Sequence, residues 1–126
     1  MAYDILFGCP GWVEGVIQAT AFIKAGMAKK CLVLGADTLS RVLDHSDRDS
    51  MIYADGAGAS MIEASKGKGG ILSHKTVTYT SEGEADFIFY GPSNDKGKGT
   101  KYIKMHGRKV YEFALSKVPL LSLIHI

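Results

Sequence analysis

The sequence contains few cysteines and no long apolar run, and these absences exclude several classes of protein. Its 126 residues include only Cys9 and Cys31, and no close group of histidines accompanies them. Two cysteines cannot build a disulfide framework or a cysteine-only zinc site, so we expect no bound metal and a reducing, cytoplasmic setting. No stretch reaches the roughly eighteen consecutive apolar residues of a transmembrane helix. The composition is that of a soluble globular protein without a membrane partner.

The sequence also has no large excess of positive or negative charge. The formal net charge of +2 is too small to indicate a nucleic-acid partner. One local basic stretch holds four lysines, which are Lys96, Lys98, Lys101 and Lys104. We interpret this stretch as a solvated loop rather than a partner site.

The N-terminal part of the chain predicts an α/β unit. Residues 2–8 are apolar except for Asp4 and predict a short strand, which is followed by a helix over residues 10–25. Residues 31–35 predict a second strand, whose continuous apolar run is typical of a sheet covered on both faces. A strand–helix–strand order favours parallel pairing of the two strands. The helix is apolar around most of its circumference and is expected to be largely buried.

The remainder alternates loops and short elements. We predict helical turns in residues 37–50, a strand region over 50–63 interrupted by the Asp-Gly-Ala-Gly-Ala segment at 55–59, a linker at 65–70, strands at 71–80 and 86–90, an exposed loop at 91–100, and an amphipathic helix from Gly107 through Val118. The last six residues, 121–126, resemble a translated sequencing adaptor, and an ordinary apolar C-terminal segment is the alternative.

Cys9 is the strongest candidate for chemistry. It follows a predicted strand and precedes a predicted helix, where the helix dipole and free backbone N–H groups stabilise a thiolate. A thiolate in that place can attack a thioester carbonyl and hold the acyl group covalently. The alternative is a structural cysteine, which is the interpretation that we favour for Cys31 within its apolar strand.

Several ordered motifs resemble one family. They are the segment Asp-Ile-Leu-Phe-Gly-Cys-Pro-Gly-Trp at 4–12, Val-Leu-Gly-Ala-Asp at 33–37, Ser-Asp-Arg at 46–48, Asp-Gly-Ala-Gly-Ala at 55–59, and Lys-Met-His-Gly-Arg-Lys-Val at 104–110. Together they resemble β-ketoacyl-[acyl-carrier-protein] synthase III of the thiolase-like condensing enzymes. The resemblance implies an αβαβα layered fold of which only the central portion is present. Residues 1–64 would then end the first half of that fold, and residues 65–120 would begin the second.

The resemblance also implies roles for individual residues. Cys9 matches the acyl-accepting nucleophile, and its backbone N–H matches a donor of the oxyanion hole. Arg48 matches an arginine of the coenzyme A site, although a surface salt bridge would be its ordinary interpretation. Leu39 and Ala54 fall where the family lines its acyl pocket. Pro10 departs from the family pattern but suits a helix start. Because relatives often carry Phe at the position of Ala54, we expect a roomier pocket and a longer or branched primer.

The implied activity is the initiating condensation of fatty acid synthesis. An acyl group passes from acyl-CoA to Cys9 and is condensed with malonyl-acyl-carrier protein, with loss of CO2 and without a cofactor. The resemblance further implies a homodimer built on the sheet edge at residues 31–35. The family's catalytic His and Asn are expected beyond Pro119, so the 126-residue chain alone should be inactive and poorly soluble. None of the four histidines present, His45, His74, His106 and His125, stands at the catalytic position.

Other readings remain open from the sequence. The parent protein could be a hydroxymethylglutaryl-CoA synthase or a ketoacyl synthase of secondary metabolism. It could also be a non-catalytic thiolase-like subunit in which Cys9 is incidental. The sequence does not determine the acyl-chain preference or the carrier-protein surface.

Overall fold

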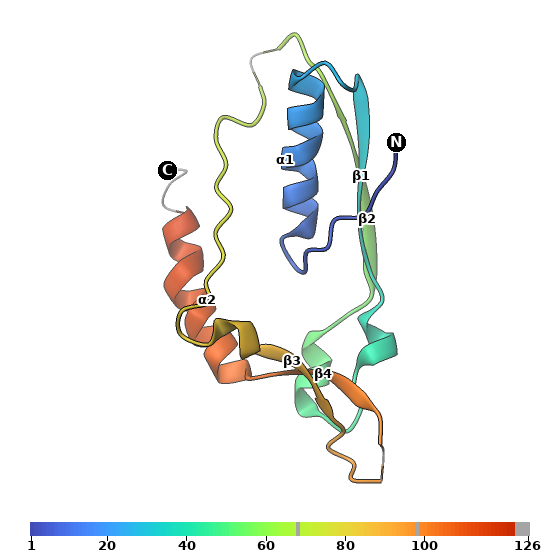
Figure 1. Cartoon of the computed structure of the whole chain (residues 1–126), viewed down its shortest axis with the longest axis vertical. Helices are drawn as coiled ribbons and strands as arrows, with labels where there is room; N and C mark the ends of the chain where they lie inside the picture. Colours follow the sequence, from blue (N-terminus) through green and yellow to red (C-terminus); the bar gives the residue numbers. More distant parts are fainter. Residues whose placement is uncertain (68, 98, 123–126) are drawn as a thin grey trace. The chain divides into compact units, whose positions relative to one another are not determined.

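A computed structural model describes residues 1–67, 69–97 and 99–122, with side chains described as far as residue 120. The chain divides into two compact units (Figure 1). The first unit consists of Met1–Asp37 and Asp55–Val77, and the second of Thr38–Ala54 and Thr78–Ile126. Among the described residues, each unit holds one two-stranded antiparallel sheet and one α-helix. The expected division into two halves of a longer fold, with its boundary at residue 64, stays a prediction.

The helix of the first unit begins and ends as the sequence predicts. Helix α1 spans Gly11–Lys24 and has Pro10 at its N-cap position. Gly26, with φ of +73°, follows the C-terminal end in the left-handed conformation that glycine adopts without steric cost. The N–H of Gly26 donates to the carbonyl of Ile23 and the N–H of Met27 to that of Phe22. This pair of bonds is a Schellman motif, which satisfies carbonyls that the helix end leaves free.

The strand pairing of the first unit differs from the prediction. Strand β1, Lys30–Asp37, pairs antiparallel with β2, Gly56–Glu63, from Lys30 opposite Glu63 to Asp37 opposite Gly56. Residues 2–8 form no strand, so the predicted parallel pair with residues 31–35 is wrong for the described residues. The physical reason is that these residues turn on themselves and lie along α1. The N–H of Phe7 donates to the carbonyl of Ile5, and the hydroxyl of Tyr3 donates to Gln18 Oε1.

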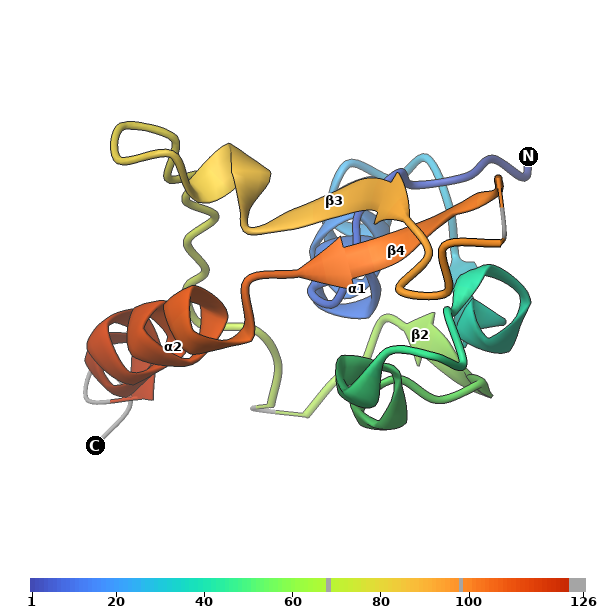
Figure 2. The same cartoon turned by 90° about the horizontal axis from the view of Figure 1, so that it is seen from below.

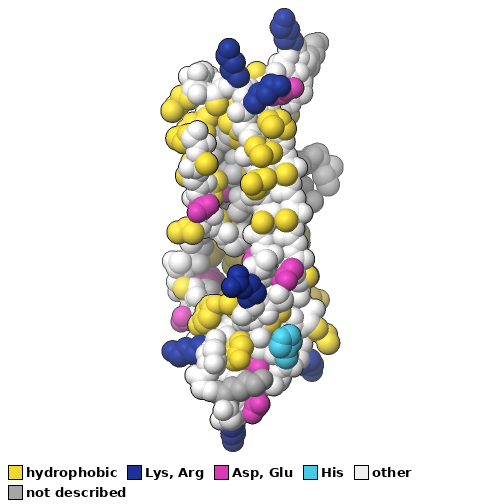
Figure 3. Space-filling view, turned by 90° about the vertical axis from the view of Figure 1, so that its right-hand side faces the viewer, with side chains coloured by type: hydrophobic (Ala, Val, Ile, Leu, Met, Phe, Trp, Pro, Cys, Tyr) yellow, Lys and Arg dark blue, Asp and Glu magenta, His cyan; other side chains and the backbone are white. Residues whose placement is uncertain are grey.

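The described residues of the unit cover only one face of this sheet. Val33 is buried on the face that packs against α1, whereas Leu32, Leu34 and Met61 are 58%, 65% and 58% exposed. The open face follows from the register, because Leu32 lies opposite Met61 and directly opposed residues share a face. Hydrophobic side chains gather over the β1–β2 ribbon on the side seen in Figure 3. The predictions of a doubly covered strand and a largely buried helix are therefore wrong for the described residues, and in α1 only Gly15 and Ala19 are buried.

Two further predicted strand regions are corrected. The Gly-Ala-Gly-Ala residues lie inside β2 rather than interrupting a strand, and residues 50–52 belong to a 3₁₀ helix. Residues 71–80 form no strand. Within the first unit, residues 71–77 run along α1 on the side away from β1 and β2 (Figure 1), and Thr76 Oγ1 donates to Glu14 Oε2 at 3.0 Å. An apolar segment becomes a strand only where another backbone offers hydrogen bonds, and here the neighbour is a helix.

The second unit contains a hairpin and a helix. Strand β3, Ile88–Pro92, pairs antiparallel with β4, Lys101–Met105, and α2 spans Gly107–Ser122 (Figure 2). The predicted helix is confirmed. The strand predicted at 86–90 is shifted by two residues, since Asp86 belongs to a 3₁₀ helix and the first two residues of the predicted loop at 91–100 belong to β3; β4 was not predicted. In the described part of this unit there are also three 3₁₀ helices, which are η1, Leu39–Val42, η2, Arg48–Ile52, and η3, Glu84–Asp86. The first two confirm the predicted helical turns. Residues 123–126, most of the suspected adaptor segment, lie outside the described residues.

Aromatic side chains hold α2 against the segment that precedes β3. The ring of Phe113 makes edge contacts with Tyr79 and Phe87, at centroid distances of 5.5 and 6.2 Å. Such edge-to-face pairs contribute about 0.5–1.5 kcal/mol beyond the area that they bury. The lysines Lys117 and Lys109 lie over the rings of Tyr79 and Phe87. The predicted amphipathic helix therefore packs its apolar face against this segment.

Candidate functional site

Cys9 lies in the turn that leads into α1. The cysteine is exposed and free, and it precedes Pro10 at the N-cap position. The turn is closed by two backbone bonds, from the N–H of Gly11 to the carbonyl of Gly8 and from the N–H of Glu14 to that of Pro10. Its thiol therefore projects from a hydrogen-bonded turn beside the positive end of a fourteen-residue helix. The predicted position of Cys9 before a helix is confirmed, whereas the strand predicted to precede it is wrong, because residues 2–8 form none.

Two glycines allow the helix that follows Cys9 to approach the sheet closely. A Cβ on Gly15 would lie 2.8 Å from Val33 Cγ1, closer than side-chain carbons approach one another. A Cβ on Gly35 would meet Trp12 Cβ at 3.3 Å, so the indole stem sits over the bare backbone of β1. These contacts lie within the first two turns of α1. They fix the depth at which the helix start, and with it the Cys9 turn, is held against β1.

Cys31, the second cysteine, has a structural setting. It lies on β1 with its Sγ 3.9 Å from the carbonyl oxygen of Ala19, a buried residue of α1. It is half-buried and faces the helix rather than solvent. This placement agrees with the structural role that the sequence favoured.

The other predicted site residues lie together in the segment 38–54 of the second unit. Leu39 opens η1 and is half-buried, Arg48 opens η2 and is exposed, and Ala54 is exposed just before β2. The guanidinium of Arg48 forms no hydrogen bond or ion pair with any residue that the structure describes. The surface salt bridge that was its alternative interpretation is therefore not seen among the described residues. The roles of these residues stay predictions.

A buried cluster of charged and polar side chains includes Asp47, the residue that precedes Arg48 in the sequence. We call it the Lys104 cluster, and its members are Asp44, Asp47, Ser93, Asn94 and Lys104. The ammonium of Lys104 donates to Asp44 Oδ2 at 2.7 Å, to Asp47 Oδ2 at 2.8 Å and to Asn94 Oδ1 at 3.1 Å. Asp44 also accepts from the N–H of Ser46, the hydroxyl of Ser93 and the N–H of Asn94. All three ammonium protons and four acceptor positions of Asp44 are thus used.

Burial makes these contacts strong. The side chains of Lys104 and Asp44 are 8% and 1% exposed, so water competes weakly for their hydrogen bonds. The hydrogen bond from Lys104 holds the pKa of Asp44 far below its usual range, and it lowers the pKa of Asp47 as well. Burial by itself would lower the pKa of Lys104, but the hydrogen bonds to the two carboxylates outweigh it and raise that pKa. All three groups are therefore ionised at neutral pH.

The sequence interpretation missed this cluster. The basic stretch predicts a solvated position for Lys104, whereas the structure places it on β4 and buries it. Lys96 and Lys101 are exposed, as expected, and Lys98 lies outside the described residues. The signal for Lys104 was its place between two apolar residues, Ile103 and Met105. Its two acidic partners are 57 and 60 residues away, too distant for any local pattern to connect them.

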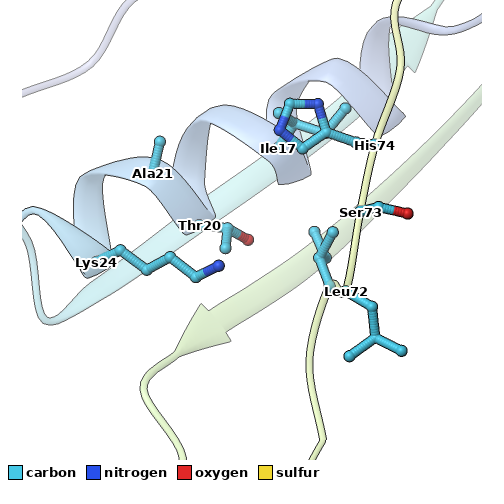
Figure 4. Close-up of a pocket in the computed structure, with 8 residues that line it drawn as sticks. Ile17, Thr20, Ala21, Lys24, Leu72, Ser73 and His74 are labelled. Atoms are coloured by element: carbon cyan, nitrogen blue, oxygen red, sulfur yellow. The ribbon is translucent and has the colours of Figure 1, made fainter.

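A groove in the first unit lies away from Cys9. It is lined on one side by Ile17, Thr20, Ala21 and Lys24 of α1, and on the other by residues 71–74. His74 extends towards Ile17, and the Lys24 side chain runs along the groove beside Thr20 (Figure 4). Neither Cys9 nor any other predicted site residue lines it. Among the described residues, no three His, Cys, Asp or Glu side chains form a group that could hold a metal ion.

Comparison with solved structures defines the fold class. The structure superposes on β-ketoacyl-[acyl carrier protein] synthase III from Thermus thermophilus with a TM-score of 0.70 and 30% sequence identity. The superposition covers 91% of this chain and 37% of the Thermus chain. The chain therefore forms part of an α/β, thiolase-like fold. No helix in the described residues has the length and apolar character needed to cross a bilayer.

Comparison with sequences then defines the family. A family model described as 3-oxoacyl-[acyl-carrier-protein (ACP)] synthase III matches residues 3–80. Curated relatives named β-ketoacyl-[acyl-carrier-protein] synthase III include one from Chelativorans sp. (strain BNC1), 37% identical over 123 residues, and one from Microcystis aeruginosa, 36% identical over 129 residues. These matches cover 93% and 94% of this chain but 38% of each relative. The chain belongs to the 3-oxoacyl-[acyl-carrier-protein] synthase III family and spans about two fifths of the length of these relatives.

Proposed function

We propose that the protein containing this chain is an initiating condensing enzyme that carries its acyl intermediate on Cys9. The single observation that supports this most directly is the placement of an exposed, free cysteine in the turn before α1 of a family member. In the first half-reaction the Cys9 thiolate attacks the thioester carbonyl of acyl-CoA. A C–S bond to Cys9 forms, the C–S bond to coenzyme A breaks, and the coenzyme A thiolate leaves.

The second half-reaction returns the cysteine to its free state. Malonyl-acyl-carrier protein loses CO2, and the resulting carbanion attacks the acyl carbonyl on Cys9. A C–C bond forms, the Cys9 thiolate leaves, and the product is a β-ketoacyl-carrier protein. Backbone N–H groups at the helix start, that of Cys9 among them, would stabilise the charge that develops on the attacked carbonyl oxygen. No cofactor is needed, because decarboxylation supplies the carbanion.

Substrate recognition is proposed for the segment 38–54. The cation of Arg48, which has no partner among the described residues, suits the phosphates or the adenine ring of coenzyme A, because a planar guanidinium can pair with the former or stack upon the latter. Leu39 and Ala54 would line the acyl pocket. The small side chain of Ala54 leaves room for a primer longer or more branched than acetyl. Acyl-carrier protein would be the partner in the second half-reaction.

We also propose a cytoplasmic homodimer. Strand β1 has one edge without a strand partner among the described residues, and the apolar face formed by Leu32, Leu34 and Met61 is open. Residues 31–35 are therefore available for a further strand or a second subunit. Light scattering of the full-length protein measures the assembly, and a monomer at micromolar concentration would contradict it.

The experiment that tests the function compares the two cysteines. Full-length protein is incubated with acyl-CoA, and the mass of the peptide that contains Cys9 is measured after proteolysis. We expect the acyl group on Cys9, loss of acylation and condensation in Cys9→Ser, and retention of both in Cys31→Ser. Acylation of neither cysteine, with Cys9 also unreactive towards alkylating agents, would instead support a non-catalytic thiolase-like subunit.

A further inference from the structure

The Lys104 cluster fixes the backbone that carries Arg48. The segment leading to Arg48 is tied to β4 at three successive points. Leu43 forms a parallel β-bridge with Ile103, Asp44 accepts from Lys104, and Asp47 accepts from Lys104 one turn later. The side chain of Asn94, from the loop after β3, adds a bond to the carbonyl of Ser46. Each contact comes from the β3–β4 hairpin, so this hairpin sets the position of the whole segment.

Asp47 connects the cluster directly to the turn of Arg48. It is the N-cap residue of η2, and its Oδ1 accepts from the N–H of Asp49 at 3.0 Å. Its Oδ2 accepts from Lys104 at 2.8 Å. One carboxylate therefore caps the 3₁₀ turn and holds that turn to β4. Arg48 is the next residue, so a rotation of the Asp47 side chain redirects the backbone from which the guanidinium extends.

The burial of the cluster indicates that it fixes one arrangement of the backbone rather than adding much stability. A buried ion pair gains little net stability, because removing its charges from water costs about as much as their attraction returns. What such a pair does provide is a single arrangement, since any other leaves a buried charge without a partner. Arg48 itself stays outside the cluster, exposed and free of described partners. The cluster thus holds the base of a cation without neutralising it.

We propose that Lys104 is a positioning residue that, through Asp47, holds Arg48 in place to bind the nucleotide portion of the coenzyme A donor. This inference rests on the proposed function. Lys104 touches neither substrate nor reacting atoms in this proposal, and its effect passes through Arg48 alone. It follows that a donor without the nucleotide should not depend on Lys104.

The test uses full-length enzyme and two donors that differ only in the nucleotide, namely acyl-CoA and the corresponding acyl-pantetheine. Losing one hydrogen-bonded contact between charged groups raises KM about tenfold. We therefore expect Lys104→Met to raise KM for acyl-CoA by about tenfold, and to leave kcat with both donors and KM for acyl-pantetheine within about twofold. Asp47→Asn should give the same pattern more mildly, because the amide oxygen can still cap η2.

Two controls isolate the pathway of the effect. Lys101→Met removes an exposed lysine from the same strand and should change neither KM. In an Arg48→Met background, Lys104→Met should have no further effect on KM for acyl-CoA, since the group it positions is gone. If Lys104→Met does not fold, Asp47→Asn supplies the comparison.

The outcomes separate this inference from the proposed function. Equal impairment with both donors, or additive effects of the Lys104 and Arg48 substitutions, would overturn the positioning role while leaving acyl transfer intact. A wild-type enzyme that transfers no acyl group from either donor would instead overturn the proposed function.

Discussion

Replacing Gly15 with alanine tests whether α1 is held against β1 at the limit of steric contact. In an exposed helix interior this change would stabilise the helix by about 1 kcal/mol, because alanine has the higher helix propensity. Here the new Cβ would lie 2.8 Å from Val33 Cγ1. Forcing an extra carbon into a packed site typically costs about 1–3 kcal/mol. The steric term therefore outweighs the propensity term, and the expected net loss is about 0–2 kcal/mol.

Truncating Val33 should reverse the sign of this effect. Val33→Ala by itself loses about 1.6 kcal/mol for two buried carbon groups, with a further term for the space left behind. In that background the clash at Gly15 is absent, so Gly15→Ala should stabilise α1 by up to about 1 kcal/mol. The coupling between the two substitutions is then about 1–3 kcal/mol, within the range for residues in contact.

Hydrogen exchange of the α1 amides in the full-length protein measures these differences. A local change of about 1.4 kcal/mol alters the exchange protection of a peptide covering residues 11–24 about tenfold. Ala21→Gly, on the exposed side of α1, is the matched control and should lose about 1 kcal/mol from propensity alone. If Gly15→Ala stabilised α1 equally in the wild-type and in the Val33→Ala background, the close contact would not be what sets the helix position.

Three further predictions concern charge and pocket size. The pKa values of Asp44 and Asp47 are lowered in the folded protein, so the stability that they contribute is present above their unfolded pKa of about 3.9 and is lost as the pH falls through the folded values. Thermal midpoints of wild type and Asp44→Asn should therefore differ most between about pH 5 and pH 8, and the difference should shrink progressively as the pH falls below about pH 4; a constant difference down to about pH 2 would contradict the assignment. The ion pair between Lys30 and Glu63 joins side chains that are 66% and 55% exposed, so Lys30→Ala should cost less than about 1 kcal/mol in denaturant unfolding, and a larger loss unaffected by salt would be inconsistent with a surface pair. Ala54→Phe should lower kcat/KM for branched or long acyl-CoA about tenfold relative to acetyl-CoA, which serves as the internal reference. A wild-type enzyme that already prefers acetyl-CoA strongly would remove the basis for that last prediction.

Local signals in the sequence predicted the elements that depend on local interactions. Pro10 and Gly26 bound α1 because the conformations they favour are needed only at its ends. The apolar run at 31–35 predicted β1, and the polar composition of residues 37–50 predicted helical turns there. The partner of β1 was not predictable in this way. Its antiparallel pairing with β2 depends on a return of the chain through η1 and η2, which no periodicity encodes.

The residues of the candidate site differ in the same way, because some depend on local interactions and others on distant partners. Cys9 is recognisable as a candidate from the sequence because the chemistry proposed for it depends on one local junction of turn and helix. Lys104 is not, because its ion pairs join residues about sixty positions apart and because a lysine in a basic stretch is usually solvated. The strand that carries it, β4, escapes prediction because its residues do not alternate, since Tyr102 and Ile103 are adjacent apolar residues between two lysines. The ion pairs between residues distant in the sequence are thus the part of this site that could be identified only from the structure.

Cys9 and Arg48 are each held in place by a structural device, meaning a contact between residues that take no part in the proposed reaction. Cys9 depends on the close approach of Gly15 to Val33, and Arg48 depends on the hydrogen bonds that Lys104 makes to Asp47. The first device is steric and insensitive to salt and pH, whereas the second requires three ionised groups. Since these devices share no residue, changing one should leave the other intact. Acylation of Cys9 by acyl-pantetheine should accordingly follow substitutions at Gly15 and ignore those at Lys104, while discrimination between the two donors should follow Lys104 alone.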